Sequence, residues 1–193
     1  MSEDNIRYYW FASMLDQDKE LNHYTLEEPY IDLPRKELDL LYDGDNEIWC
    51  FEMKFHRHDT KSTFAHTMSA GEIFDDLQRL KYFRSASNKR VRRFFLYVSD
   101  SEMNEYFVGK NSSSNTYRKE IKKIFEGKST CISLRKENVP KTFWKEAFKS
   151  LPTEERASMQ LSTVNLVGST DLDRLKSSSF QDSECHIRLY EII

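Results

Sequence analysis

The sequence predicts a single α/β (α+β) domain in which helices flank a central mixed sheet. Apolar residues in the first hundred positions switch between helical spacing and strand-like runs, which is typical of that class. The 193 residues suit one domain, and their 38% hydrophobic content allows a sizeable core. We expect residues 2–100 to form the core of the domain and residues 101–193 to be a C-terminal addition to it.

The first hundred residues predict the order helix, strand, strand, strand, helix, strand. Apolar residues from Ile6 to Leu15 recur at helical spacing, and Ser2 or Asp4 is available as the N-cap. The loosely alternating segment 22–33, which ends before a proline, predicts the first strand.

A hairpin is predicted next. Residues 36–43 and 47–55 are two apolar segments on either side of a turn. Gly44 lies in that turn and is available for a positive φ.

A second helix and a further strand complete the predicted core. Apolar residues over 70–86 have helical spacing, and the apolar run 94–98 is typical of a strand covered on both faces. Strand, crossover helix and strand in succession predict a βαβ unit. Beyond Asp100 the patterns predict helices at 101–109, 115–127 and 141–151, and strands at 130–136, 158–168 and 185–193.

Composition excludes several classes of protein. The formal net charge is -3, so any nucleic-acid binding must use a local patch. No apolar run has the length of a membrane span, and the start of the chain lacks the pattern of a signal peptide. The cysteines are odd in number and far apart, which indicates no disulfide framework and favours a reducing, cytoplasmic compartment. They are Cys50, Cys131 and Cys185.

Charged side chains in otherwise apolar strands are the most informative feature of the sequence. Alternation places Glu52 and Lys54 side by side on one face of the third strand. In the second strand Asp39 takes one face while Leu38 and Leu40 take the other. If the two strands pair, Asp39 lies beside Glu52.

Two carboxylates and a lysine have a definite chemical use. Carboxylate oxygens bind Mg²⁺ or Mn²⁺, which polarises a phosphodiester and stabilises the charge of its transition state. Lys54 can orient or help to deprotonate the attacking water, or stabilise the phosphate. The backbone carbonyl of Met53 is a further candidate ligand.

Asp39, twelve further residues and then Glu52-Met53-Lys54 resemble the motif of the PD-(D/E)XK nucleases, the restriction-endonuclease-like superfamily. The predicted order of residues 2–100 is similar to the α-β-β-β-α-β core of that family. The resemblance implies a nuclease fold in which Asp39 and Glu52 bind the metal and Lys54 is the catalytic lysine. Leu38 stands in place of the proline of the family motif.

Some branches of this family add residues to the site. An extra acid comes from the first helix or the first strand, and Glu28 is the strand candidate. A Q-x-x-x-Y motif follows in one branch, and Gln78 and Tyr82 have that spacing. His56 shares the face of Lys54 and is a candidate for contact with substrate.

Three histidines lie at the end of the third predicted strand and in the segment after it. The spacing of His56, His58 and His66 matches no familiar zinc pattern, so loop histidines are favoured over a zinc site.

A basic run begins in the second predicted helix and leads into the strand after it. Its aromatic residues and serines suit an edge that contacts phosphates, although a charge run is often only a solvated face. The candidates for nucleic-acid binding are Lys81, Arg84, Lys89, Arg90, Arg92 and Arg93. A second basic run covers 117–123.

Simpler interpretations exist for the central residues. Asp39, Glu52 and Lys54 can form ion pairs on a surface hairpin, where each pair is worth about 0–1 kcal/mol. Asp75 and Arg79, on one helix, have the spacing of a helix-stabilising pair.

The first functional hypothesis is a metal-dependent endo- or exonuclease that hydrolyses phosphodiester bonds, with DNA as its partner in preference to RNA. Such a small chain can act as a homodimer or within a larger complex. The alternative is a catalytically silent protein of the same fold that binds nucleic acid or another protein. A third hypothesis is a different α/β protein in which Asp39 and Lys54 form an ion pair.

Overall fold

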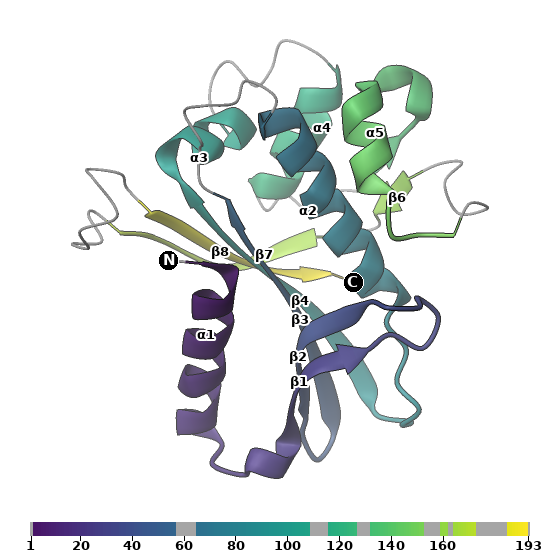
Figure 1. Cartoon of the computed structure of the whole chain (residues 1–193). Helices are drawn as coiled ribbons and strands as arrows, with labels where there is room; N and C mark the ends of the chain where they lie inside the picture. Colours follow the sequence, from purple (N-terminus) through teal and green to yellow (C-terminus); the bar gives the residue numbers. More distant parts are fainter. Residues whose placement is uncertain are drawn as a thin grey trace.

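The computed structural model describes residues 2–56, 65–108, 116–126, 132–152, 159–161, 164–172 and 185–192. His58 and Cys131 lie outside these residues. Helices pack on both faces of a central sheet (Figure 1). The predicted α+β class with a mixed, helix-flanked sheet is therefore confirmed.

The central sheet has six strands in the order β1-β2-β3-β4-β8-β7. The strands are β1 Tyr24–Pro29, β2 Glu37–Asp43, β3 Glu47–His56, β4 Arg90–Asp100, β7 Val164–Leu172 and β8 Cys185–Ile192. β3 and β4 are parallel, and the other neighbours are antiparallel. The predicted hairpin and the predicted parallel pair are both present.

The described helices are α1 Glu3–Gln17, α2 Ala65–Tyr82, α3 Ser101–Val108, α4 Thr116–Phe125 and α5 Lys141–Ala147. Short 3-10 turns, η1 Leu21–His23 and η3 Lys136–Asn138, supplement them. None of these helices is both long and apolar enough to cross a bilayer. Over residues 2–100 the helices and strands follow the predicted order.

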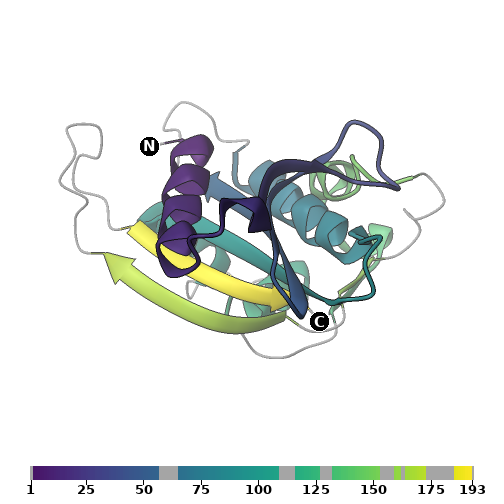
Figure 2. The ribbon, with the colours of Figure 1, turned by 90° about the horizontal axis from the view of Figure 1, so that it is seen from below.

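The C-terminal part of the chain extends the sheet beyond β4. β8 pairs with β4 from Arg93↔Ile192 to Asp100↔Cys185, and β7 pairs with the far side of β8 (Figure 2). The segment 158–168, predicted as one strand, contains the whole of one short strand and the start of another. β6 Met159–Leu161 pairs with β5 Ile132–Leu134 in a separate sheet, and β7 follows in the main sheet.

Two apolar clusters hold the helices to the two faces of the sheet. On one face α1 contributes Ile6, Trp10, Phe11 and Met14 against side chains of β2, β3, β4 and β8. On the other face, α2 to α5 pack over the opposite side chains of the same strands, including Tyr97 of β4. The burial of both faces explains why β4 lacks alternation in its apolar run.

The start of β2, up to Asp39, lies outside the pairing of β2 with β3. The β2–β3 register runs from Asp43↔Ile48 and ends at Leu40↔Phe51. Leu40 lies in the cluster under α1, whereas Leu38 lies in the cluster under α2. The expectation that Leu38 and Leu40 share one face is therefore wrong, because β2 leaves β3 between them.

The N-terminal turn of α1 is fixed by a capping box. Ser2 is the N-cap, and its Oγ accepts a hydrogen bond from the Asn5 amide, while the Ser2 amide donates to Asn5 Oδ1. This places Glu3 in the first helical turn, where it faces β3.

Two glycines lie in close contacts, and neither has a left-handed backbone conformation. The φ of Gly44 lies outside the left-handed region, so the turn does not use the positive φ available to this glycine. A Cβ at Gly44 would lie 2.7 Å from the Tyr42 ring. Gly71 of α2 lies against α5, and a Cβ there would be 2.7 Å from both Glu146 Cβ and Phe143 O.

We predict that Gly71→Ala destabilises the protein by about 1–3 kcal/mol, because the added methyl group has no space between α2 and α5. Urea unfolding at equilibrium measures the change. In a helix without that contact, the same substitution would stabilise the protein by about 1 kcal/mol. A stabilised variant would therefore contradict the close packing of the two helices.

Candidate functional site

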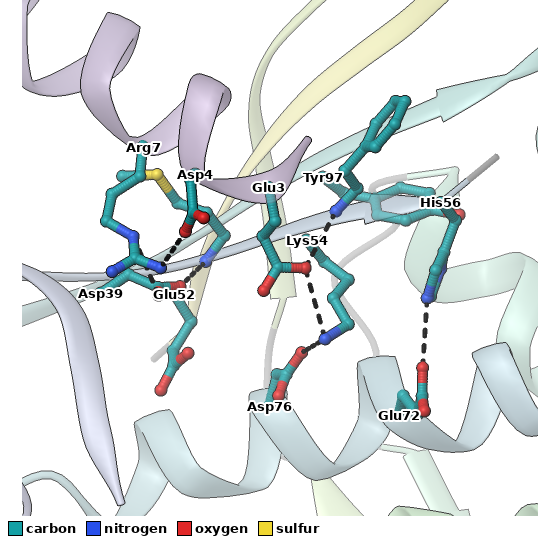
Figure 3. A network of polar contacts seen from close by, with 12 residues as sticks. Glu3, Asp4, Arg7, Asp39, Glu52, Lys54, His56, Glu72, Asp76 and Tyr97 are labelled. Carbon is teal, nitrogen blue, oxygen red and sulfur yellow. Dashed lines mark hydrogen bonds and ion pairs between the residues drawn. The ribbon is translucent and has the colours of Figure 1, made fainter. Parts of the chain in front are cut away.

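Asp39, Glu52 and Lys54 come together where β2 leaves β3, between the first turn of α1 and the middle of α2 (Figure 3). Glu52 is only 2% exposed, and the side chains of Asp39 and Lys54 are 14% and 19% exposed. These three charges are therefore interior, and the surface-hairpin interpretation is wrong.

Glu52 is held through both of its carboxylate oxygens. Tyr30, which directly follows β1, donates its hydroxyl to Oε1 at 2.7 Å. Arg79 of α2 donates from Nη2 to Oε2 at 2.9 Å. One oxygen thus has a neutral donor and the other has a guanidinium.

Asp39 has the same arrangement. The Met53 amide donates to Oδ2 at 2.7 Å, and Arg7 Nε lies 3.5 Å from Oδ1. Each carboxylate is therefore oriented by a neutral donor and neutralised by an arginine. The Asp39–Lys54 ion pair of the third hypothesis is not formed, since the two side chains have different partners.

Lys54 connects the two helices across the sheet. Its Nζ lies 3.4 Å from Glu3 Oε2 of α1 and 3.5 Å from Asp76 Oδ2 of α2. Burial alone would lower the pKa of Lys54, but the charges of Asp76, Glu3 and Glu72 outweigh it and raise the pKa. Lys54 is thus held as a cation, which favours charge stabilisation over proton abstraction.

Burial raises the pKa of the two carboxylates, whereas it lowers the pKa of a lysine. It raises the pKa of Asp39 to about 6, against the opposing effects of the Met53 amide and Arg7. Burial also raises the pKa of Glu52, and the charges of Asp39 and Asp76 add to that effect while Arg79 opposes it. A cation bound between these carboxylates would relieve their mutual repulsion.

Several polar atoms of this network lack a hydrogen-bond partner. In the described part of the chain, seven buried side-chain nitrogen or oxygen atoms have none, and four of the seven belong here. They are Arg7 Nε, His56 Nε2, Asp76 Oδ2 and Arg79 Nε. Three of the four still lie 3.5 Å from an ion-pair partner, in Asp39, Lys54 or Glu72. The network therefore combines long charge contacts with incomplete hydrogen bonding, which a ligand can complete.

The first helix brings one further acid, Glu3, to this centre. Glu3 contacts Lys54 and also accepts from the Phe55 amide at 3.5 Å. Glu28, the strand candidate, is half-buried on β1 opposite Leu38. Glu3 could have been suggested from its place in the first turn, but nothing in the sequence distinguished it from Asp4.

The remaining candidates lie around this centre. Gln78 is buried in α2, and Tyr82 packs against the cluster under that helix. The ring of His56 lies between Tyr97 and Glu72, whose Oε2 is 3.5 Å from His56 Nε2. The close approach of the His56 ring is the main cause that lowers the pKa of Glu72 to about 2.

Two adjacent acids of α2 have different roles. Asp76 is in the network, paired with Arg79 and Lys54. Asp75 points elsewhere, and its carboxylate accepts hydrogen bonds from the Ser150 amide and hydroxyl. Asp75 therefore ties α2 to the turn after α5, and the predicted Asp75–Arg79 pair is not the contact that Arg79 makes.

The predicted basic run lies toward the start of β4. Arg90 is paired with Glu47, and Phe95 is paired with Glu52, in the parallel register. Five residues of strand, roughly 16 Å, thus separate Arg90 from the level of Glu52.

Most cations of this run already have partners. Arg93 donates to the carbonyls of Leu80 and Phe83 at 2.9 and 3.0 Å, so it caps the end of α2. Arg92 makes two hydrogen bonds with the Glu191 carboxylate. The other ion pairs are Lys89–Asp43, Arg90–Glu47 and Arg84–Asp32, and Lys81 is exposed. Contact of these residues with nucleic acid stays a prediction.

Binding of a divalent cation by these carboxylates stays a prediction. Within the described ranges no three His, Cys, Asp or Glu side chains are grouped as metal ligands. Mg²⁺ is commonly bound through only one or two carboxylates, with water completing its octahedron. Asp39 and Glu52 remain the predicted pair, and the Met53 carbonyl remains the predicted third ligand.

Comparison of the chain with family models, with curated proteins and with solved structures found no significant match. The site itself is therefore the evidence on function.

We predict that Asp39→Asn flattens the pH dependence of stability. Because the pKa of Asp39 rises from 3.8 to about 6 on folding, its contribution is complete below pH ~4 and is lost as the pH rises through about 6. Relative to the variant, the wild-type free energy of unfolding should fall by up to about 3 kcal/mol over that window.

Urea titrations in EDTA between about pH 4 and 7 measure this difference. Asp45→Asn, at an exposed position of the β2–β3 turn, is the control. Parallel pH profiles for wild type and Asp39→Asn would show that Asp39 titrates normally.

Proposed function

We propose that this protein is a metal-dependent nuclease of the PD-(D/E)XK type. The observation that carries the proposal is the matched arrangement of Asp39 and Glu52. Each buried carboxylate has one oxygen held by a neutral donor and the other facing a cationic side chain. Two oriented carboxylates beside a charged lysine suit hydrolysis of a phosphodiester.

The fold supports the same proposal. The order α1, β1, β2, β3, α2, β4 matches the core expected of that superfamily, with β3 and β4 parallel. The motif residues lie on β2 and β3 at the point where the two strands separate. We propose a restriction-endonuclease-like core on these grounds.

Each side chain has a role in this proposal. Asp39 and Glu52 would hold Mg²⁺ or Mn²⁺, which supplies Lewis-acid activation of the phosphodiester and its attacking water. Lys54, fixed by Glu3 and Asp76, contributes positive charge beside the phosphate. Tyr30 and the Met53 amide orient the carboxylates before any ligand arrives.

A specific observation favours the second candidate, a silent binding protein of the same fold. Arg7 and Arg79 already pair with the two carboxylates, so each carboxylate has a counter-ion without metal. A chain that has lost catalysis could keep such pairs as internal supports. Binding of Mg²⁺ separates the two candidates, since the silent protein does not need it.

We predict cleavage of DNA in Mg²⁺ or Mn²⁺, with loss of activity of about 100-fold or more in Asp39→Asn, Glu52→Gln and Lys54→Met. Purified protein is incubated with circular and linear duplexes, single-stranded DNA and RNA, and products are resolved on gels. Circular substrates distinguish an endonuclease from an exonuclease.

Asp75→Asn is the matched control for these variants. Asp75 lies next to Asp76 in α2 but binds Ser150, so the variant should retain cleavage. If the wild-type protein binds neither Mg²⁺ nor Mn²⁺ in calorimetry and cuts no substrate, the nuclease proposal fails and the silent binding protein is favoured.

A further inference from the structure

Arg7 and Arg79 have similar burial, with side chains 13% and 12% exposed, and each faces one of the two central carboxylates. The rest of their contacts differ. Those contacts indicate which arginine is free to change partner.

Arg7 is anchored outside the site. Its Nη1 donates to Glu27 Oε1 at 2.7 Å and its Nη2 to Asp4 Oδ1 at 3.0 Å. Only Nε faces Asp39, at 3.5 Å. Loss of the Asp39 contact would leave this guanidinium in place.

Arg79 is held mainly by acids of the site. Its Nη2 is shared between Glu52 and Asp76, and its Nε is buried without a hydrogen-bond partner. The guanidinium carbon lies 6.0 Å from the centre of the Tyr30 ring, a loose cation–π contact. Arg79 thus depends on Glu52 and on the neighbouring Asp76 for its position.

Tyr30 determines which oxygen of Glu52 is exchangeable. Its hydroxyl, whose pKa is raised mainly by burial, stays protonated and holds Oε1. The other oxygen, Oε2, is bound to Arg79. A divalent cation at Glu52 would therefore compete with Arg79 for Oε2.

We propose that Arg79 is a phosphate-binding residue that exchanges partners: it neutralises Glu52 in the metal-free protein and contacts a substrate phosphate once a divalent cation takes Oε2. The inference rests on the proposed nuclease function. Asp76 keeps the released guanidinium beside Lys54, because it contacts both cations. The unpartnered Nε and a terminal nitrogen then form the fork that binds a phosphate through two hydrogen bonds.

The exchange predicts opposite effects of Arg79→Met on the two ligands. Removal of the competing cation should tighten Mn²⁺ binding by about tenfold or more, because a like charge beside the metal is lost. The same change should weaken DNA binding in Ca²⁺ by about tenfold or more, through loss of charge-assisted hydrogen bonds to phosphate. A purely structural arginine would not give this pair of opposite shifts.

Mn²⁺ affinity is measured by calorimetry, and DNA affinity by fluorescence anisotropy with labelled single- and double-stranded oligonucleotides in Ca²⁺. Arg135→Met is the control for the loss of one positive charge, because Arg135 is exposed just after β5 and is not among the residues of this network. This variant should change neither the Mn²⁺ affinity nor the DNA affinity. Arg79→Lys is a second variant in case Arg79→Met does not fold; it keeps the charge, so Mn²⁺ affinity should stay within about threefold while DNA binding weakens.

Unchanged Mn²⁺ affinity in Arg79→Met would overturn the exchange, even if the wild-type protein cleaves DNA. Tighter Mn²⁺ binding with unchanged DNA affinity would make Arg79 a counter-ion only and overturn its phosphate role. A wild-type protein that binds no divalent cation would overturn this inference together with the proposed function.

Discussion

The separation of β2 from β3 at Asp39 is the constraint on which the site depends. In a continuous sheet, side chains of α1 and α2 would be kept apart by a layer of strands. Here Lys54 reaches acids of both helices, and Asp39 accepts the Met53 amide that faces the opened edge. The apolar clusters on the two faces hold the helices at this opening, so packing and electrostatics act on the same few residues.

Local periodicity was sufficient to predict the strands of residues 2–100 and the central charges. Asp39, Glu52 and Lys54 stand out because each interrupts an apolar strand, and charge there requires a partner. Their partners could not be predicted, since they come from distant segments: Tyr30 is 22 residues from Glu52, Arg79 is 27 residues from it, and the Phe55 amide lies 52 residues from Glu3. No periodic pattern encodes such contacts.

In the basic run, composition predicted a role that the contacts in the fold do not support as directly. Its density of arginine and lysine suggested a phosphate-binding edge, but Arg92 finds an acid 99 residues away in β8 and Arg93 binds the end of α2. Once β8 is placed beside β4, much of the apparent positive charge is compensated. A run of like charges therefore describes a surface only after its neighbours in the sheet are known.

The energetics of the buried pairs bear on whether the site has a function. A buried ion pair gains little over apolar side chains of similar volume, and replacing one is often neutral or stabilising. The fold alone therefore gives no reason to place Glu52 at 2% exposure with Arg79 as its counter-ion. The two buried carboxylates also repel each other, and several nearby polar atoms lack hydrogen bonds. An arrangement that is costly for stability but ordered in geometry is expected where a ligand supplies the missing interactions.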